Sequence, residues 1–205
     1  NLEIAKISFQ TALDLDPDFI DAAINLTLAL KMLGQTSMAM RLALSTLEKA
    51  PNYAPALNSL GLIYLDLNQN QEAKNAFKLA CRNNQNFADA YNNLGNTLTR
   101  LDQLTEANRN YNRALKLEPR NANFWSNKAA SFQADNRIED AIKACDAALE
   151  VDPNHADAQW NRSIANLISG NLDNGFTGYE ARWSLPEFKN RTFNSELWKT
   201  QNLNG

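Results

Sequence analysis

Apolar residues recur along this chain three and four positions apart, with polar residues between them. One such stretch contains Leu57, Leu60, Tyr64 and Leu67, and the next contains Ala73, Ala76, Phe77 and Ala80. This i, i+3, i+4, i+7 spacing is typical of amphipathic α-helices, and no strand signal is present. We therefore predict an all-α protein built from successive pairs of helices.

Short polar segments separate the predicted helices. Residues 33–36, 67–70 and 169–172 contain Gly or Asn, which adopt positive φ and end helices. Asp-Pro or Glu-Pro steps stand at residues 16–17, 118–119 and 152–153, and proline excludes helical geometry from the residue before it. These signals predict a turn inside each pair and a break between pairs.

One period organises these units. Proline stands at positions 17, 51, 119 and 153, at spacings of 34, 68 and 34 residues. Two further series share the 34-residue interval. One holds the small residues Thr27, Gly61, Gly95, Ala129 and Ser163, and the other holds the mostly bulky Phe9, Ala43, Phe77, Tyr111, Cys145 and Tyr179. We expect each bulky side chain to fill the space beside a small one, where two helices approach closely.

The run Tyr91-Asn92-Asn93-Leu94-Gly95, followed by Ala107, Tyr111, Ala114 and Pro119, resembles a tetratricopeptide repeat. The resemblance implies a right-handed superhelical solenoid of antiparallel helix pairs, whose first helices line a concave groove that binds peptides or proteins. We expect the second helix of a partial repeat at 1–19, four complete repeats over 20–155, a divergent capping repeat at 156–183 and a tail at 184–205. Lys128 and Arg162 depart from the pattern, because other repeats carry leucine there.

Composition narrows the choice of partners. The chain has 205 residues, 44% of them hydrophobic and 21% charged, with a net charge of −3. We expect a folded protein that binds neither nucleic acid nor an anionic membrane, since such binders concentrate Lys and Arg on one face. No apolar stretch reaches the ~20 residues of a membrane span, and no signal peptide is visible, so a cytoplasmic location is predicted.

Catalytic and metal-binding residue types are scarce. Cys81, Cys145 and His155 are the whole complement of cysteine and histidine, too few for a zinc site or a disulfide framework. The helical periodicity places both cysteines on buried faces and His155 in a turn. We predict no metal, no cofactor and no catalytic residue in this chain.

Helical geometry predicts which residues would meet a partner, because the stripe opposite the packed face of each first helix lines the groove. The sixth position of successive repeats reads Asn25, Ser59, Asn93, Asn127 and Asn161. The predicted peptide-binding groove comprises Asn25, Asn58, Asn92, Asn93, Asn96, Asn127, Asn161 and Asp89. An amide offers both a donor and an acceptor, so it can bind the backbone of an extended peptide. The row resembles the asparagine ladder of O-GlcNAc transferase; the alternative is that it reflects a chain rich in Asn throughout.

The ends of the groove are apolar, and its second positions carry no cations. Candidate anchors are Ile24 and Leu28 at one end and Trp160 and Ile164 at the other, although solenoid ends also expose apolar residues for lack of neighbours. Repeats that bind chaperone C-terminal tails use Lys and Arg to hold the terminal carboxylate. This stripe is acidic or neutral, so we predict no binding to such tails.

Residues 175–183 resemble a junction of bacterial proteins in which a tetratricopeptide array precedes a glycosyltransferase domain. Only 22 residues follow Trp183, fewer than the ~30 of one nucleotide-binding βαβ unit. We therefore expect this chain not to be an enzyme by itself, whatever the longer protein does. Instead of a direct chemical role, four of these residues can form a structural cap on the last helix pair: Tyr179, Glu180, Arg182 and Trp183.

Three hypotheses remain. The first is a protein- or peptide-binding scaffold, and the second is the substrate-recruiting region of a larger glycosyltransferase whose catalytic domain lies beyond residue 205. Both predict an extended segment held in the groove. The third is a self-associating solenoid, which predicts a homodimer that groove substitutions leave unchanged.

Overall fold

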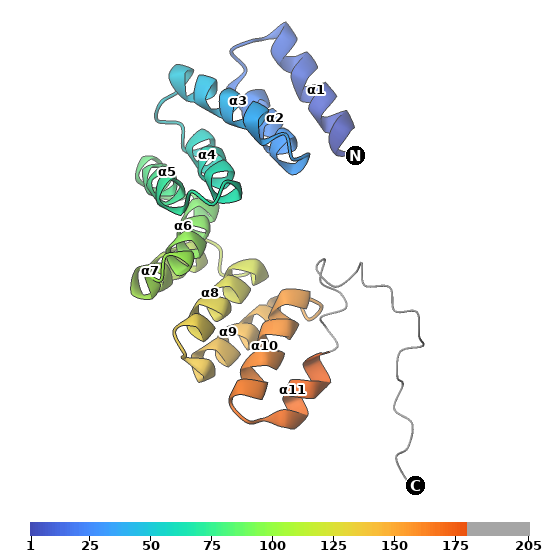
Figure 1. Cartoon of the computed structure of the whole chain (residues 1–205), viewed down its shortest axis with the longest axis vertical. Coiled ribbons are helices and arrows are strands. Elements are labelled where there is room, and N and C mark those ends of the chain that lie inside the picture. Colours follow the sequence, from blue (N-terminus) through green and yellow to red (C-terminus); the bar gives the residue numbers. More distant parts are fainter. Residues whose placement is uncertain (180–205) are drawn as a thin grey trace.

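The computed structural model describes residues 1–179, and within them all regular structure is α-helical. One helix, α1 (Leu2–Leu15), precedes five helix pairs that follow one another along a curved stack (Figure 1). The pairs are α2 (Ile20–Met32) with α3 (Thr36–Lys49), α4 (Ala54–Asp66) with α5 (Asn70–Asn83), α6 (Ala88–Arg100) with α7 (Leu104–Leu117), α8 (Ala122–Ala134) with α9 (Ile138–Val151), and α10 (Ala156–Ile168) with α11 (Leu172–Tyr179). The expected tail 184–205, and with it Glu180, Arg182 and Trp183, lies outside the described residues.

The turn inside each pair has the same backbone geometry. One residue of each turn has a positive φ, and these residues are 34 positions apart: Gly34 (72°), Asn68 (58°), Asp102 (57°), Asn136 (54°) and Gly170 (82°). A positive φ cannot continue a right-handed helix, so it ends the first helix and redirects the chain into the second. The turns predicted around Gly34, Asn68 and Gly170 are confirmed.

Helices contact only near neighbours in the sequence. Each helix packs against the next one, and the first helices α2, α4, α6, α8 and α10 also contact one another in order. The apolar core is accordingly divided into successive clusters along the stack. None of the helices within residues 1–179 combines the length and apolar character that a bilayer crossing requires.

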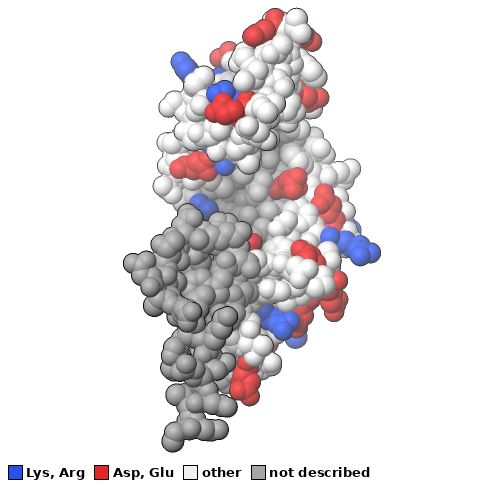
Figure 2. Space-filling view, turned by 90° about the vertical axis from the view of Figure 1, so that its right-hand side faces the viewer, with Lys and Arg blue, Asp and Glu red and all other residues white. Residues whose placement is uncertain are grey.

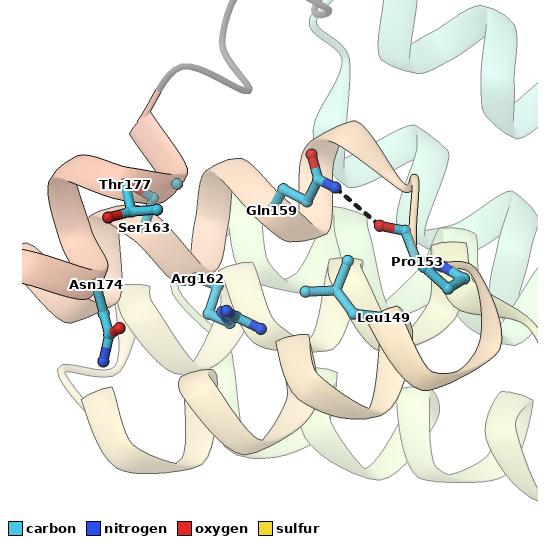
Figure 3. A pocket seen from close by; sticks show the side chains of 8 residues that line it. Leu149, Pro153, Gln159, Arg162, Ser163, Asn174 and Thr177 are labelled. Atoms are coloured by element: carbon cyan, nitrogen blue, oxygen red, sulfur yellow. Dashed lines mark hydrogen bonds between the residues drawn. The ribbon is translucent and has the colours of Figure 1, made fainter.

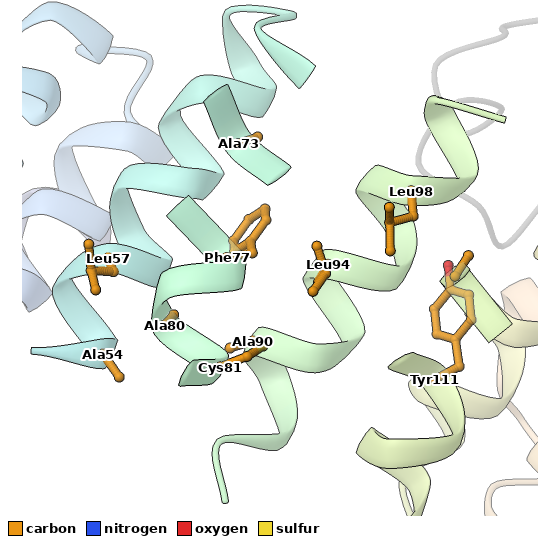
Figure 4. Close-up of a cluster of buried hydrophobic side chains, with 11 residues drawn as sticks. Ala54, Leu57, Ala73, Phe77, Ala80, Cys81, Ala90, Leu94, Leu98 and Tyr111 are labelled. Carbon is orange, nitrogen blue, oxygen red and sulfur yellow. The ribbon is translucent and has the colours of Figure 1, made fainter. Parts of the chain in front are cut away.

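The pairing of small and bulky residues is confirmed in the two central pairs. A Cβ atom built on Gly61 would lie 2.5 Å from the Phe77 ring, and one on Gly95 would lie 2.7 Å from the Tyr111 ring. Both aromatic side chains are completely buried, and they occupy the cluster shown in Figure 4. Glycine therefore lets α4 approach α5, and α6 approach α7, by leaving room for an aromatic ring.

The two cations that depart from the repeat pattern contact aromatic rings in one case and a carboxylate in the other. The Lys128 Nζ lies 5.0 Å from the centroid of the Trp125 ring and 5.4 Å from that of Phe132. Burial lowers the pKa of Lys128, and the neighbouring Arg137 lowers it further. Arg162 of α10 donates a hydrogen bond to Asp146 of α9 at 3.1 Å. Cation–π contacts and an ion pair thus replace the leucine packing of earlier repeats.

Candidate peptide-binding groove

The predicted row of asparagines forms hydrogen bonds between successive first helices. The Asn93 Nδ2 donates to the Asn58 Oδ1 at 3.0 Å, and the Asn127 Nδ2 donates to the Asn92 Oδ1 at 3.0 Å. The Asn161 Nδ2 donates to the Ser126 Oγ at 3.3 Å. Each bond joins a sixth position to the fifth position of the preceding repeat. We call these six residues the asparagine ladder; it links α4, α6, α8 and α10.

A buried tyrosine orients the next amide of the groove. The Tyr111 hydroxyl donates to the Asn96 Oδ1 at 2.8 Å and lies 3.3 Å from the Thr99 Oγ1. Burial raises the pKa of Tyr111 to about 12, so the hydroxyl keeps its proton at neutral pH. Because the carbonyl oxygen of Asn96 is taken by the core, its Nδ2 is the half of the amide left for a ligand.

These bonds divide the groove amides into donors and acceptors. Asn93 and Asn127 use an N–H in the ladder and keep their Oδ1, whereas Asn96 keeps its Nδ2; within residues 1–179 these groups have no other side-chain partner. Asn58 and Asn92 also keep their Nδ2, but the two residues are only 9% and 7% exposed. Asn93, Asn96, Asn127 and Asn161 are half-buried. Among the hydrogen-bonded asparagines, those that a ligand can reach therefore lie on α6, α8 and α10.

The ladder stops at the N-terminal side of the groove. Asn25 is exposed, but Ser59, its counterpart on α4, donates to the carbonyl of Pro55 within its own helix. An ion pair of 3.0 Å between Lys31 and Asp66 joins α2 to α4 instead. The predicted residue Asn25 is thus in the groove stripe but outside the hydrogen-bonded row.

Two residues that close repeats were missed from the sequence, although their spacing could have indicated them. The Tyr53 hydroxyl donates to the Asp21 Oδ1 at 2.8 Å. The His155 Nε2 lies 2.9 Å from the Asn123 Oδ1, and its Nδ1 accepts from the backbone N–H of Ala158. Because Nδ1 is an acceptor there, Nε2 carries the proton and donates to Asn123. Each pair links the last residue of a repeat to its second residue.

The predicted Asp89 lies exposed at the start of α6. Desolvation raises the pKa of its carboxyl, and the nearby Glu118 raises it further. The second position of this repeat thus carries an acidic side chain close to another carboxylate.

The candidate anchors differ in exposure. Leu28, Trp160 and Ile164 are half-buried, and the Trp160 ring lies 5.0 Å from that of Tyr179. Ile24 is only 8% exposed because it packs in the core, so its expected role as a surface anchor is corrected. Met32 and Ile168, near the ends of the same helices, are well exposed.

Acidic and basic side chains both lie on the side of the molecule that faces right in Figure 1. Seen from that side, acidic and basic side chains lie in small scattered groups with uncharged surface between them (Figure 2). The first helices contribute asparagine, serine and alanine to their middle positions, such as Asn96, Ser126 and Ala130. The middle of the groove can therefore offer hydrogen bonds and apolar contacts.

A second hollow of about 460 Å³ lies in the last pair, away from the asparagine ladder. Its lining includes Gln159 and Arg162 of α10, Leu149 of α9, and Asn174 and Thr177 of α11 (Figure 3). The Gln159 Nε2 donates to the Pro153 carbonyl at 2.8 Å. Gln159 thus stands where most earlier repeats carry leucine or an aromatic residue, and Arg162 stands where most of them carry leucine. Both side chains form hydrogen bonds within the protein.

Neither thiol is placed for catalysis. Cys81 and Cys145 are buried, as predicted, and burial raises the pKa of each to about 12. A thiol with such a pKa is protonated at neutral pH and is a poor nucleophile. Within the described residues, His, Cys, Asp and Glu form no group of three or more that could hold a metal ion.

Solved structures share this fold. A tetratricopeptide protein of Thermus thermophilus is 22% identical, with a TM-score of 0.73 over 81% of this chain and 91% of its own. YrrB, described as having an unusual peptide-binding site, is 22% identical, with a TM-score of 0.64 over 87% and 92% of the two chains. A chain of the Cut9–Hcn1 hetero-tetramer of the APC/C is 16% identical, with a TM-score of 0.81 over 91% of this chain and 37% of its own. No curated protein matches in sequence.

Family models match most of the helix pairs. A tetratricopeptide-repeat model matches residues 54–87, another matches residues 127–183, and a TPR-repeat model matches residues 95–136. The match over residues 54–87 coincides with the α4–α5 pair, and the other two together extend from α6 to α11. The protein therefore contains tetratricopeptide repeats, which make up its helical solenoid.

Proposed function

We propose that this chain is a protein-interaction scaffold that holds an extended segment of a partner in the groove lined by α4, α6, α8 and α10. Tetratricopeptide repeats typically serve protein–protein interaction, and the amide groups that the groove leaves accessible suit a segment bound by hydrogen bonds. The proposal rests on the division of the groove amides into free acceptors and free donors. Asn93 and Asn127 keep acceptors and Asn96 keeps a donor, which together complement the N–H and C=O groups of a peptide backbone.

Apolar side chains at both ends of the groove would add affinity. Leu28 and Met32 lie on α2, and Trp160 and Ile164 lie on α10. A segment with polar or small residues in its middle and apolar residues toward its ends would contact both ends and the asparagine ladder. Backbone recognition makes the middle of the groove tolerant of sequence, so the ends would provide most of the selectivity.

The test uses a peptide selected on the protein from a displayed library of random 15-residue segments. Asn96→Asp keeps an oxygen for the Tyr111 hydroxyl but replaces the free Nδ2 donor by a second oxygen. We expect the variant to bind the selected peptide about tenfold more weakly, because one donor is lost and an acceptor faces an acceptor. Fluorescence polarisation of the labelled peptide measures the change.

Asn112→Asp is the matched control, since Asn112 is exposed on the outer side of α7. It introduces the same charge at a distance from the groove and should leave the affinity within about twofold. Equal affinities for the two variants, or failure to select any peptide, would refute the proposal.

The substrate-recruiting region of a larger glycosyltransferase remains the alternative, and it uses the same groove. The coding sequence beyond residue 205 distinguishes the two, because the alternative requires a nucleotide-sugar-binding α/β domain there. Self-association, the third hypothesis, predicts a dimer in sedimentation that Asn96→Asp leaves unchanged.

A further inference from the structure

Corresponding positions of the second helices can be compared directly, because the repeat places them on the same outward side. The four outward positions are residues 41, 44, 45 and 48 of α3, residues 75, 78, 79 and 82 of α5, residues 109, 112, 113 and 116 of α7, and residues 143, 146, 147 and 150 of α9. All are exposed except the half-buried Arg113 and Ala147.

Cations are concentrated at these positions in the two central repeats. In α5 and α7 they are Lys78, Arg82, Arg109, Arg113 and Lys116, with no acidic residue among the eight positions. In α3, Arg41 is balanced by Glu48. In α9, the same set contains Lys143 together with Asp146 and Glu150. The chain as a whole carries a net charge of −3, so this outer face has the opposite sign to the rest of the molecule.

The two helices present their cations as one surface. An ion pair of 2.9 Å joins the Lys78 Nζ on α5 to the Glu106 Oε1 on α7. The hydrogen bond with Lys78 is the main cause that lowers the pKa of Glu106, with further contributions from Lys74 and Arg109. Among residues 1–179, Arg82, Arg109 and Lys116 form no ion pair. In Figure 1, α5 and α7 lie on the outer side of the stack, beyond α4 and α6.

Apolar surface lies among these cations. A hollow of about 570 Å³ is lined by Asn75, Lys78, Leu79 and Arg82. Leu79 is 45% exposed there, and Leu44 is exposed at the corresponding outward face of α3. A partner that supplies both carboxylates and apolar side chains would bury Leu79 and neutralise the free cations. A nucleic acid would gain only the charge contacts and would be repelled by the acidic remainder of the chain.

We propose that the outer face of α5 and α7 is a second interaction surface, which binds an acidic amphipathic segment of a partner protein independently of the groove. Complementary charge accelerates such an encounter and selects the partner. The scaffold would then hold two segments at once, one in the groove and one on its outer side.

The test uses a labelled 16-residue peptide that carries Glu on one helical face and Leu on the other. In fluorescence polarisation, the triple variant Arg82→Glu/Arg109→Glu/Lys116→Glu should bind it at least about tenfold more weakly than the native chain. The native affinity should fall as NaCl rises from about 50 to about 200 mM, because salt screens exposed charges. The variant with Gln at the same three positions should fall between the two.

The matched control is Lys143→Glu, which reverses a charge at the position of α9 that corresponds to Arg109. It and the groove variant Asn96→Asp should each leave the affinity for this peptide within about twofold, so failure here is separable from failure of the groove proposal. Circular dichroism checks that every variant remains helical. The proposal is overturned if the triple variant binds as the native chain does, if the native chain shows no saturable binding, or if a 20-base-pair DNA duplex binds more tightly than the peptide.

Discussion

The α4–α5 and α6–α7 pairs are packed alike but differ by one hydroxyl group. In each pair a glycine of the first helix makes room for a buried aromatic ring of the second, Phe77 in one and Tyr111 in the other. The Tyr111 hydroxyl binds Asn96 and lies close to Thr99. At the corresponding positions α4 carries Leu62 and Leu65, which pack against the cluster that contains Phe77. In these two pairs, the buried tyrosine is matched by an asparagine on the first helix and the buried phenylalanine by leucine.

The largest effect on stability is expected from substituting the glycine that contacts the aromatic ring in each pair. Gly61→Ala and Gly95→Ala each place a methyl group in contact with an aromatic ring, at 2.5 and 2.7 Å. We expect each to lower the free energy of unfolding by about 2–3 kcal/mol, because overpacking outweighs the gain of about 1 kcal/mol in helix propensity. Urea denaturation measures the change. In Gly178→Ala the new methyl group lies 3.2 Å from the Ser163 Cβ, so its cost should be smaller; equal costs at all three sites would contradict this account.

Exchanging phenylalanine and tyrosine between the two pairs tests the role of the hydroxyl group. Phe77→Tyr brings a hydroxyl to a buried site flanked by Leu62 and Leu65, and should cost about 1–3 kcal/mol of unfolding free energy. Tyr111→Phe loses the bond to Asn96 and should cost about 1 kcal/mol.

Adding Leu62→Asn to Phe77→Tyr supplies the missing acceptor and should recover about 1 kcal/mol of the loss. Thermal and urea unfolding of the single and double variants measure the coupling between the two positions. Strict additivity of Phe77→Tyr and Leu62→Asn would show that the hydroxyl does not act through this position.

The smallest effect is expected at the turns. Asp102 in the α6–α7 turn and Asn68 in the α4–α5 turn both have positive φ, a conformation that asparagine tolerates well and glycine adopts freely. Asp102→Gly and Asn68→Gly should each change the unfolding free energy by less than about 1 kcal/mol, with Asp102→Gly the more favourable. Gly34→Ala, at the same position of the α2–α3 turn, should cost about 1 kcal/mol. A stabilising Gly34→Ala would show that φ does not limit these turns.

Much of the fold was predictable because it depends on local spacing. A 34-residue interval that relates Gly61 to Gly95 and Phe77 to Tyr111 indicates both the helix pairs and their closest contacts. Proline, glycine and asparagine at the turns act through their own backbone geometry, which is independent of the rest of the chain. These parts follow from residue types and intervals alone.

The chemistry of the groove was predictable only in part. The asparagine row was visible, but its bonds were not, because a bond such as Asn93 to Asn58 depends on how far one helix pair advances and rotates relative to the next. The same limit explains why Ile24 is buried although the helical stripe predicts its exposure. Net charge does not indicate the cations of α5 and α7, because it averages over all faces of the molecule.

The asparagine ladder also has a mechanical consequence. A superhelix of stacked helix pairs can be stretched like a spring. The hydrogen bonds from Asn93, Asn127 and Asn161 join each helix pair to the next between α4 and α10. Between α2 and α4, the polar contact found within residues 1–179 is the partly exposed ion pair of Lys31 and Asp66. Under tension, high salt should therefore weaken the joint between α2 and α4 and leave the hydrogen-bonded joints between α4 and α10 unchanged.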